Sequence, residues 1–240
     1  MNLSTLITRI KIKLGIYTIA LPIDNVDGFI EDVIKDITLP VFSQYNPYTE
    51  RLHVNLKNLK RIDKDTTYET FLLPEFNERK LLYVKNVEYD DRSLSAIGLW
   101  DGTTPYACGS LVNQMMISNA ASKLSTLTIP KLTFQFMPPR TIRLYNAYTS
   151  YNVIMDLAFQ HDRSLQSIPP MAEESFFKLA LLDAKDSLYP IVKHYNEIES
   201  AYGRIELKID DWANAESERN DLLSQWDDSY HLDLAKIYYA

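Results

Sequence analysis

SFFKLALLDAKDSLYPIVKHYNEIESAYGRIELKIDDWANAESERNDLLSQWDDSYHLDLAKI, the stretch Ser175–Ile237, decides the fold of this chain. Apolar residues recur in it at alternating steps of four and three, the spacing of one face of an α-helix. The two runs are Phe177, Leu181, Ala184, Leu188, Ile191, Tyr195, Ile198 and Tyr202, then Trp212, Ala215, Leu222, Trp226, Tyr230, Leu234 and Ile237. The spacing predicts two long helices joined by a strand-like piece at Arg204–Ile209.

Two features of the sequence indicate where these helices break and where they begin. Pro190 cannot donate a helical hydrogen bond and clashes with the carbonyl four residues back, so we expect a break or kink near Tyr189. Asp210 and Asp211 directly precede Trp212, where a carboxylate caps free backbone N–H groups and favours the positive end of the helix dipole. We therefore expect one of them to cap a last helix whose buried face carries Trp212 and Trp226.

Helices are also predicted at the N-terminus. The pattern of Leu3–Leu14 predicts a helix that Gly15 stops. A second helix follows Pro22, capped by Asp24 or Asn25, and Pro40 is expected to end it. Its expected buried stripe is Val26, Ile30, Val33 and Ile37.

Alternating apolar residues predict strands in the middle of the chain. The expected strands lie near 52–56, 71–73, 81–87, 131–137, 141–145 and 153–159, and Pro138-Pro139 is expected to turn the chain between two of them. The fold class is α+β, a mainly antiparallel β middle region flanked by N-terminal and long C-terminal helices. We expect N-terminal helices in 1–40, a β-rich region in 41–170 with a long excursion at 90–128, and a C-terminal helical unit in 171–240 that packs with the N-terminal helices.

Composition restricts the function. The 240 residues carry a net charge of −7, which argues against a sequence-independent binder of duplex DNA. Cys108 is the single cysteine, so neither an intrachain disulfide nor a thiolate metal cage is possible. No stretch approaches the roughly 20 apolar residues of a membrane span, and Met1–Gly15 is not a signal peptide. We predict no membrane partner.

Residues that chemistry would require are not found in a recognisable pattern. The four histidines, His53, His161, His194 and His231, lack ligand spacing, and a surface or hydrogen-bonded role fits each better. The six isolated glycines form no phosphate loop, and Cys108 has no base near it in sequence. The basic run of Lys57, Lys60, Arg61 and Lys64 fits a solvated turn, with contact to nucleic acid in a pore as the weaker alternative. We predict no enzyme activity, no catalytic residue, no cofactor and no metal.

Tyrosine is abundant, with 16 copies against six glycines. Its large apolar ring with a polar tip suits protein interfaces, although a Tyr-rich core and surface is the plain alternative. Long loops are often binding surfaces, which draws attention to the excursion at 90–128. The candidate interface residues are Trp100, Asp101, Pro105, Tyr106, Tyr45 and Tyr48.

The terminal unit resembles the C-terminal segment of neck and connector-type structural proteins of large tailed bacteriophages. The residues that carry the resemblance are Ser175–Ala180 and Asp183–Lys185, then Ala201–Leu207, Asp211-Trp212 and Ala215-Glu216; it extends more weakly to Phe134–Pro139 and Ile142–Tyr145. Those proteins show a helix, a Tyr/Phe-Gly turn into a short strand, and an acidic-tryptophan start to a last helix. The family has no catalytic residues to transfer to this chain.

The resemblance implies a virion structural protein, synthesised in the host cytoplasm, that forms a homo-oligomeric ring at the head–tail junction. Such a neck protein links portal to tail around the DNA channel, and an acidic protein suits a lumen through which DNA slides without specific binding. Its expected partners are portal, neck and tail proteins. A tail-terminator or baseplate role is the near alternative, and a cytoplasmic enzyme or small-ligand binder with a pocket in the β region is the alternative of another class.

Overall fold

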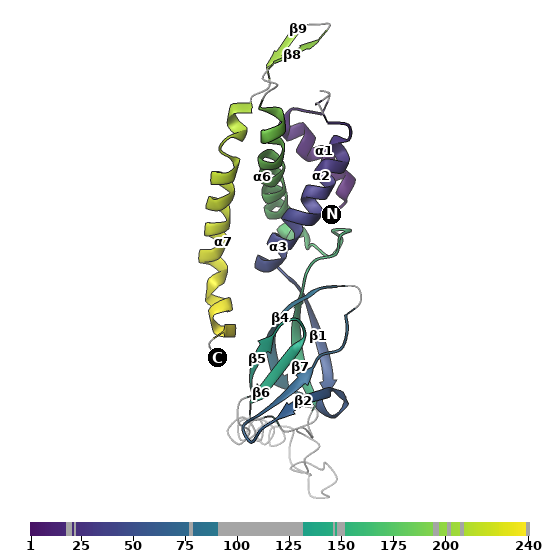
Figure 1. Ribbon diagram of the computed structural model, residues 1–240, viewed down its shortest axis with the longest axis vertical. Coiled ribbons are helices and arrows are strands. Elements are labelled where there is room, and N and C mark those ends of the chain that lie inside the picture. Colours follow the sequence, from purple (N-terminus) through teal and green to yellow (C-terminus); the bar gives the residue numbers. More distant parts are fainter. Residues whose placement is uncertain are drawn as a thin grey trace, which may run out of the picture. The chain divides into compact units, whose positions relative to one another are not determined.

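A computed structural model shows an α+β protein, which confirms the predicted fold class (Figure 1). It describes residues 1–17, 21, 23–76, 79–90, 132–145, 147, 152–193, 197–200, 203–206 and 209–238, with backbone alone at 197–200, 203–206, 209–210 and 229–238. The chain divides into two compact units. The helical unit comprises Met1–Tyr48, Glu78–Lys80 and Phe159–Ala235, and the β unit comprises Thr49–Asn77, Leu81–Ala158 and Lys236–Ala240.

The first helix, α1, spans Leu3–Leu14 as predicted. The side chain of Asn2 accepts a hydrogen bond from the backbone N–H of Ser4 and caps its start. Gly15 ends it with φ of 74°, a left-handed conformation in which a side chain would be strained. The backbone N–H of Ile16 then donates to the carbonyl of Lys11 at 3.0 Å.

The second helical segment runs through Pro40 instead of ending there. It consists of α2 (Val26–Val33), a π-helical turn η1 (Ile34–Thr38) and α3 (Leu39–Tyr45), with Asn25 as the N-cap. The backbone N–H of Leu39 donates to the carbonyl of Ile34, five residues back, so the hydrogen-bond ladder shifts just before the proline.

This π-helical turn also corrects the predicted buried stripe. A π turn takes up more residues than an α turn and rotates the helix face that follows it. Ile30, Val33 and Ile34 are buried before the turn, and Thr38, Leu39 and Phe42 after it. Ile37, predicted to be buried, is 43% exposed.

The predicted long helix after Ser175 is α6, Glu173–Val192, preceded by the 3₁₀ turn η3, Pro170–Ala172. It continues through Pro190 and ends two residues later at Val192, so the predicted break near Tyr189 was wrong. Ile198, expected to continue the helical stripe, lies on a strand, while Tyr195 and Tyr202 lie outside the described residues. The chain instead forms a two-stranded antiparallel ribbon of β8 (Glu197–Ser200) and β9 (Gly203–Glu206).

The last helix, α7, spans Ala215–Tyr238. Trp212 is buried, but it lies in a separate 3₁₀ turn, η4 (Ile209–Trp212), ahead of the helix. The predicted cap by Asp210 or Asp211 was therefore wrong, because α7 starts four residues after Asp211. Trp226, on α7 itself, is partly buried and packs against the core of the helical unit.

The core of the helical unit is built where α1, α2, η1 and α3 meet α6. Fully buried side chains from each element interdigitate there, and Trp212 closes the cluster. Its best-buried members are Leu6, Ile10, Ile30, Ile34, Leu39, Phe42, Phe176, Leu179 and Leu188. The expected periodic stripe of α6 holds for Phe177, Ala184 and Leu188, which are all buried.

The β unit contains two sheets. The three-stranded sheet has the order β1-β7-β4, where β1 is Tyr48–Asn55, β7 is Asn152–Phe159 and β4 is Leu81–Tyr89. The four apolar residues expected to alternate on β7, Val153, Met155, Leu157 and Phe159, are all buried. A 3₁₀ turn, η2 (Leu56–Asn58), follows β1.

The four-stranded sheet has the order β2-β3-β6-β5 and is antiparallel throughout. Its strands are β2 (Lys60–Lys64), β3 (Tyr68–Leu72), β5 (Thr133–Met137) and β6 (Thr141–Tyr145). Met137 pairs with Thr141, so Pro138-Pro139 lie in the tight turn that the sequence predicts. Ile142, Leu144 and Phe71 are buried and supply the core side of this sheet.

Candidate functional site

A cluster around His161 is the place where the structure most resembles a chemical site. The backbone N–H of His161 donates to Ser43 Oγ at 3.1 Å, and ring Nε2 lies 2.7 Å from the carbonyl oxygen of Asn46. A carbonyl can only accept, so Nε2 carries a proton. Ring Nδ1 lies 3.0 Å from Ser167 Oγ, which is 2.9 Å from Asp162 Oδ1.

This arrangement differs from a nucleophilic triad. A triad places the histidine between the serine and the acid, with one ring nitrogen on the serine hydroxyl and the other on the carboxylate. Here Ser167 lies between His161 and Asp162, and the second ring nitrogen is bonded to a backbone carbonyl. The cluster ties the segment after β7 to the end of α3, which is a structural role and fits the predicted hydrogen-bonded histidine.

Burial controls the charge of this cluster. It lowers the pKa of His161 below the ordinary 6.5, against the opposing effects of the hydrogen bond to Asn46 and the charge of Asp162. Burial alone would raise the pKa of Asp162, but hydrogen bonds from Ser164 and Ser167 lower it overall. The neutral ring and the ionised carboxylate are therefore the favoured forms.

A second buried polar cluster joins three parts of the helical unit. Asp183 on α6 accepts a hydrogen bond from Thr38 Oγ1, in the π-helical turn, at 2.7 Å. Its other carboxylate oxygen accepts from Arg219 Nε on α7 at 2.5 Å. One sequence feature indicates this site, because the carboxylate of Asp183 directly precedes Ala184, which belongs to the buried stripe of α6.

Three residues of the basic run predicted to be a solvated turn, Lys60, Arg61 and Lys64, lie on β2 instead, and Lys57 lies in η2. Arg61 and Lys64 on this strand both pair with the carboxylate of Glu69, which lies opposite on β3 and is 7% exposed. Two of the four bases thus neutralise a nearly buried acid of their own sheet. Lys57 and Lys60 are exposed.

In the part of the chain that the structure describes, neither metal ligands nor the open groove supplies a further candidate for a chemical site. No group of three or more histidine, cysteine or acidic residues is placed there to hold a metal ion. An open groove of about 810 Å³ lies between α1 and α2. Its charged side chains are paired, Lys11 with Asp27 at 2.8 Å and Glu31 with Lys35. No helix among the described residues is long and apolar enough to cross a bilayer.

Two of the predicted interface residues lie in the described part of the chain, and both make contacts within it. The Tyr45 ring packs edge-on to Trp226, with centroids 5.5 Å apart. Burial, and then a hydrogen bond to the Asp227 carboxylate, raise the pKa of Tyr45. The guanidinium of Arg79 lies 4.1 Å from the centre of the Tyr48 ring. Trp100, Asp101, Pro105 and Tyr106, together with Cys108 and His194, lie outside the described residues.

Apolar side chains on the surface indicate where the protein can make further contacts. Among the residues that the structure describes, the large apolar side chains that are exposed are Ile12, Tyr17, Ile37, Ile62 and Met171. A family model described as bacteriophage ring protein matches residues 1–240.

The chain belongs to the bacteriophage ring protein family. No curated protein matches it. A bacteriophage ring protein is a structural protein that assembles into an oligomer, and the polar clusters described above suit that role because they join elements of the fold to one another. The resemblance to phage structural proteins drawn from the sequence is confirmed at this level.

Proposed function

We propose that this bacteriophage ring protein forms the ring at the head–tail junction that links portal to tail around the DNA channel. The observation that carries the proposal is the family match over residues 1–240. The C-terminal pattern shared with neck and connector proteins, Ser175–Ala180, Ala201–Leu207 and Asp211-Trp212, supports the station in the neck. The protein acts by holding neighbours and carries out no catalysis.

The net charge of the chain supports a position of the ring around the DNA channel. A net charge of −7 suits a lumen that repels phosphate, through which DNA would pass without being held. A closed ring needs heterologous contacts, in which one patch of a copy meets a different patch of the next. Trp100, Asp101, Pro105, Tyr106, Tyr45 and Tyr48 stay candidate contacts with neighbouring copies or with portal and tail proteins.

The test is to locate and count the protein in purified virions. Quantitative mass spectrometry gives the copy number per particle, and cryo-electron microscopy of particles carrying a C-terminal tag locates it. We expect a copy number that corresponds to a complete ring, and density for the tag at the neck. Density at the tail end or the baseplate would replace the neck by the tail-terminator or baseplate role. Absence from virions, or one copy per particle, would overturn the ring.

A further inference from the structure

The outward face of α7 carries small and acidic side chains. Ala215, Leu222, Leu223 and Trp226 face the core of the helical unit. Ser217, Asp221, Ser224 and Asp228 recur at steps of four, three and four on the opposite side of the helix, and all four are exposed. Glu216 and Glu218 flank this face and are also exposed. Among the described side chains of α7, residues 215–228, the single base is Arg219, which is bound to Asp183.

The outward face of α1 has the opposite character. Leu6, Ile7, Ile10 and Leu14 face the core, and Ile12 is 57% exposed on the opposite side. Arg9, three residues before Ile12, lies next to it on this side of the helix, and Lys11 and Lys13 lie at the two edges of the face. The sequence of α1 contains no acidic residue. Arg9 pairs with Glu174 in an exposed contact, which is weak in water. Lys11 is paired with Asp27 and partly buried, and Lys13 is exposed.

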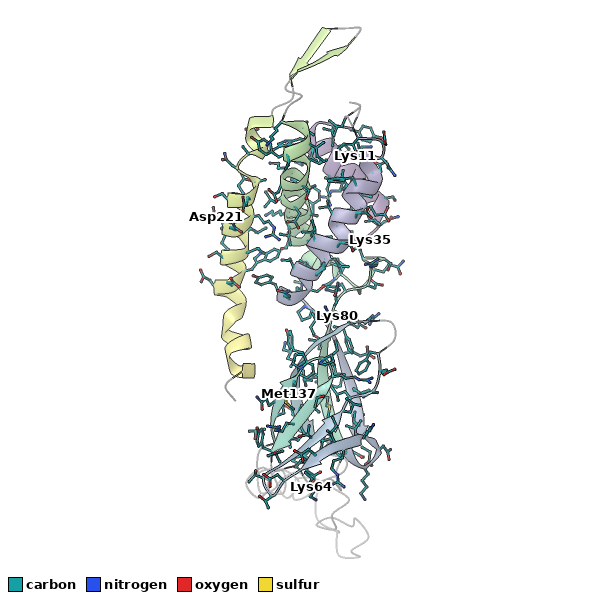
Figure 2. The ribbon with its side chains drawn as sticks, viewed as in Figure 1. Lys11, Lys35, Lys64, Lys80, Met137 and Asp221 are labelled. Atoms are coloured by element: carbon teal, nitrogen blue, oxygen red, sulfur yellow. The ribbon has the colours of Figure 1, made fainter. Side chains whose placement is uncertain are left out.

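The helices that carry these two faces, α7 and α1, lie on opposite sides of α6 within the same helical unit (Figure 1). On one flank the guanidinium of Arg9 stacks on the ring of Phe177 at 4.3 Å. On the other, Arg219 of α7 bonds to Asp183. Figure 2 shows the labelled Asp221 on α7 and the labelled Lys11 on the far side of α6. A copy therefore carries a basic, apolar-centred patch on one flank and an acidic patch on the other.

We propose that the outer face of α7 in one copy binds the outer face of α1 in the next copy of the same chain. This inference rests on the proposed ring. Like faces repel, since α7 against α7 brings carboxylates together and α1 against α1 brings bases together. Opposite charges therefore select the head-to-tail contact that closes a ring. Ile12 supplies the apolar centre, and Ser217 and Ser224 leave room for it.

Charge reversal tests the contact. The variant Ile12→Glu/Lys13→Glu makes the α1 face acidic, and Asp221→Lys/Asp228→Lys makes the α7 face basic. We expect each to lower incorporation into particles, in a phage lacking its own copy, by roughly tenfold or more. Combining all four substitutions in one chain should restore incorporation, because the faces are again opposite. Co-expressing the two separate variants should restore it by alternation.

A matched control separates this face from a general effect of charge. Lys60→Glu/Ile62→Glu makes the same change of residue types on β2, where Ile62 is 54% exposed. We expect it to be incorporated like the wild type. An equal loss in this control, or no rescue by the four-substitution chain when it shows wild-type circular dichroism, would overturn the α1–α7 contact.

Cross-linking gives a second readout that does not depend on lost assembly. In a Cys108→Ser background, Ile12→Cys/Ser224→Cys places one thiol on each face, and oxidation of intact particles should yield a ladder of covalent oligomers. Either single cysteine should give monomers. Dimers from Ile12→Cys alone, or no ladder from particles that contain the ring, would overturn this contact and leave the ring itself intact. Particles without the chain would instead overturn the proposed function.

Discussion

Asp183 and Arg219, 36 residues apart in sequence, form the ion pair that fastens α7 to α6, with Nε 2.5 Å from the carboxylate oxygen. The Asp183 side chain is 1% exposed, and that of Arg219 is 21% exposed. Taking a carboxylate this far out of water is costly, and the cost is offset only while its partners stay in place. The attachment of α7 therefore depends on this polar contact as well as on the apolar face of the helix.

Removing the arginine should destabilise the helical unit strongly. Arg219→Ala leaves the buried carboxylate with Thr38 alone, and we expect a loss of about 3–5 kcal/mol in the free energy of unfolding. Urea unfolding followed by fluorescence in a Trp100→Phe background measures it, because Trp212 and Trp226 both belong to the helical unit. Arg163→Ala, which breaks the exposed pair with Asp36, is the control and should change little. Equal losses in the two variants would contradict the buried-pair account.

Because of the π-helical turn, two isoleucines three residues apart should contribute very differently to the free energy of unfolding. Ile34 is fully buried, so Ile34→Ala should cost about 2–5 kcal/mol through lost contacts and a cavity. Ile37 is 43% exposed, so Ile37→Ala should fall within about 0.5 kcal/mol of the wild type. The same unfolding measurement compares them. A larger loss at Ile37 would mean that the helix keeps α-helical phase up to Pro40.

The two tryptophans of the C-terminal region should differ. Trp212 is 5% exposed in the core of the helical unit, and Trp212→Ala should cost about 3–5 kcal/mol. Trp226 is partly buried, edge-on to Phe42 and Tyr45, so Trp226→Ala should cost less. Thermal unfolding followed by circular dichroism ranks the two variants. The reverse order would show that Trp226, not Trp212, anchors this end of the chain.

His161 should make the protein less stable in mild acid. Because burial lowers its pKa in the folded state, the unfolded chain binds the proton more tightly, and the contribution to stability is complete above about pH 6.5 and lost as the pH falls below it. His161→Gln removes this titration, so the free energy of unfolding should vary less between roughly pH 7 and pH 5.

Asp162 acts in a separate window. Its lowered pKa gives a contribution that is lost only as the pH falls below its ordinary 3.8. Parallel slopes for the wild type and His161→Gln would mean that His161 does not titrate differently on unfolding.

Local periodicity was enough to predict most of the elements. Leu3–Leu14, the strands at 141–145 and 152–159, and the start of α6 follow from repeats of 3.6 or two residues, which depend on the chain alone. Two of the predictions that were wrong took a proline as the end or the break of a helix. Pro40 and Pro190 both lie inside helices. The hydrogen-bond pattern shifts in the π-helical turn just before Pro40, and Pro190 lies in the last turn of α6.

Contacts between distant segments decided the rest. No local pattern pairs Asp183 with Arg219, or brings Asn46 and Ser167 to the two ring nitrogens of His161. Nor can helical spacing foresee that a π turn hides Thr38 and exposes Ile37. Periodicity reports which side of an element is apolar, because that property lies within a few residues along the chain. Which polar group meets which partner depends on how the elements pack, and only the tertiary structure determines it.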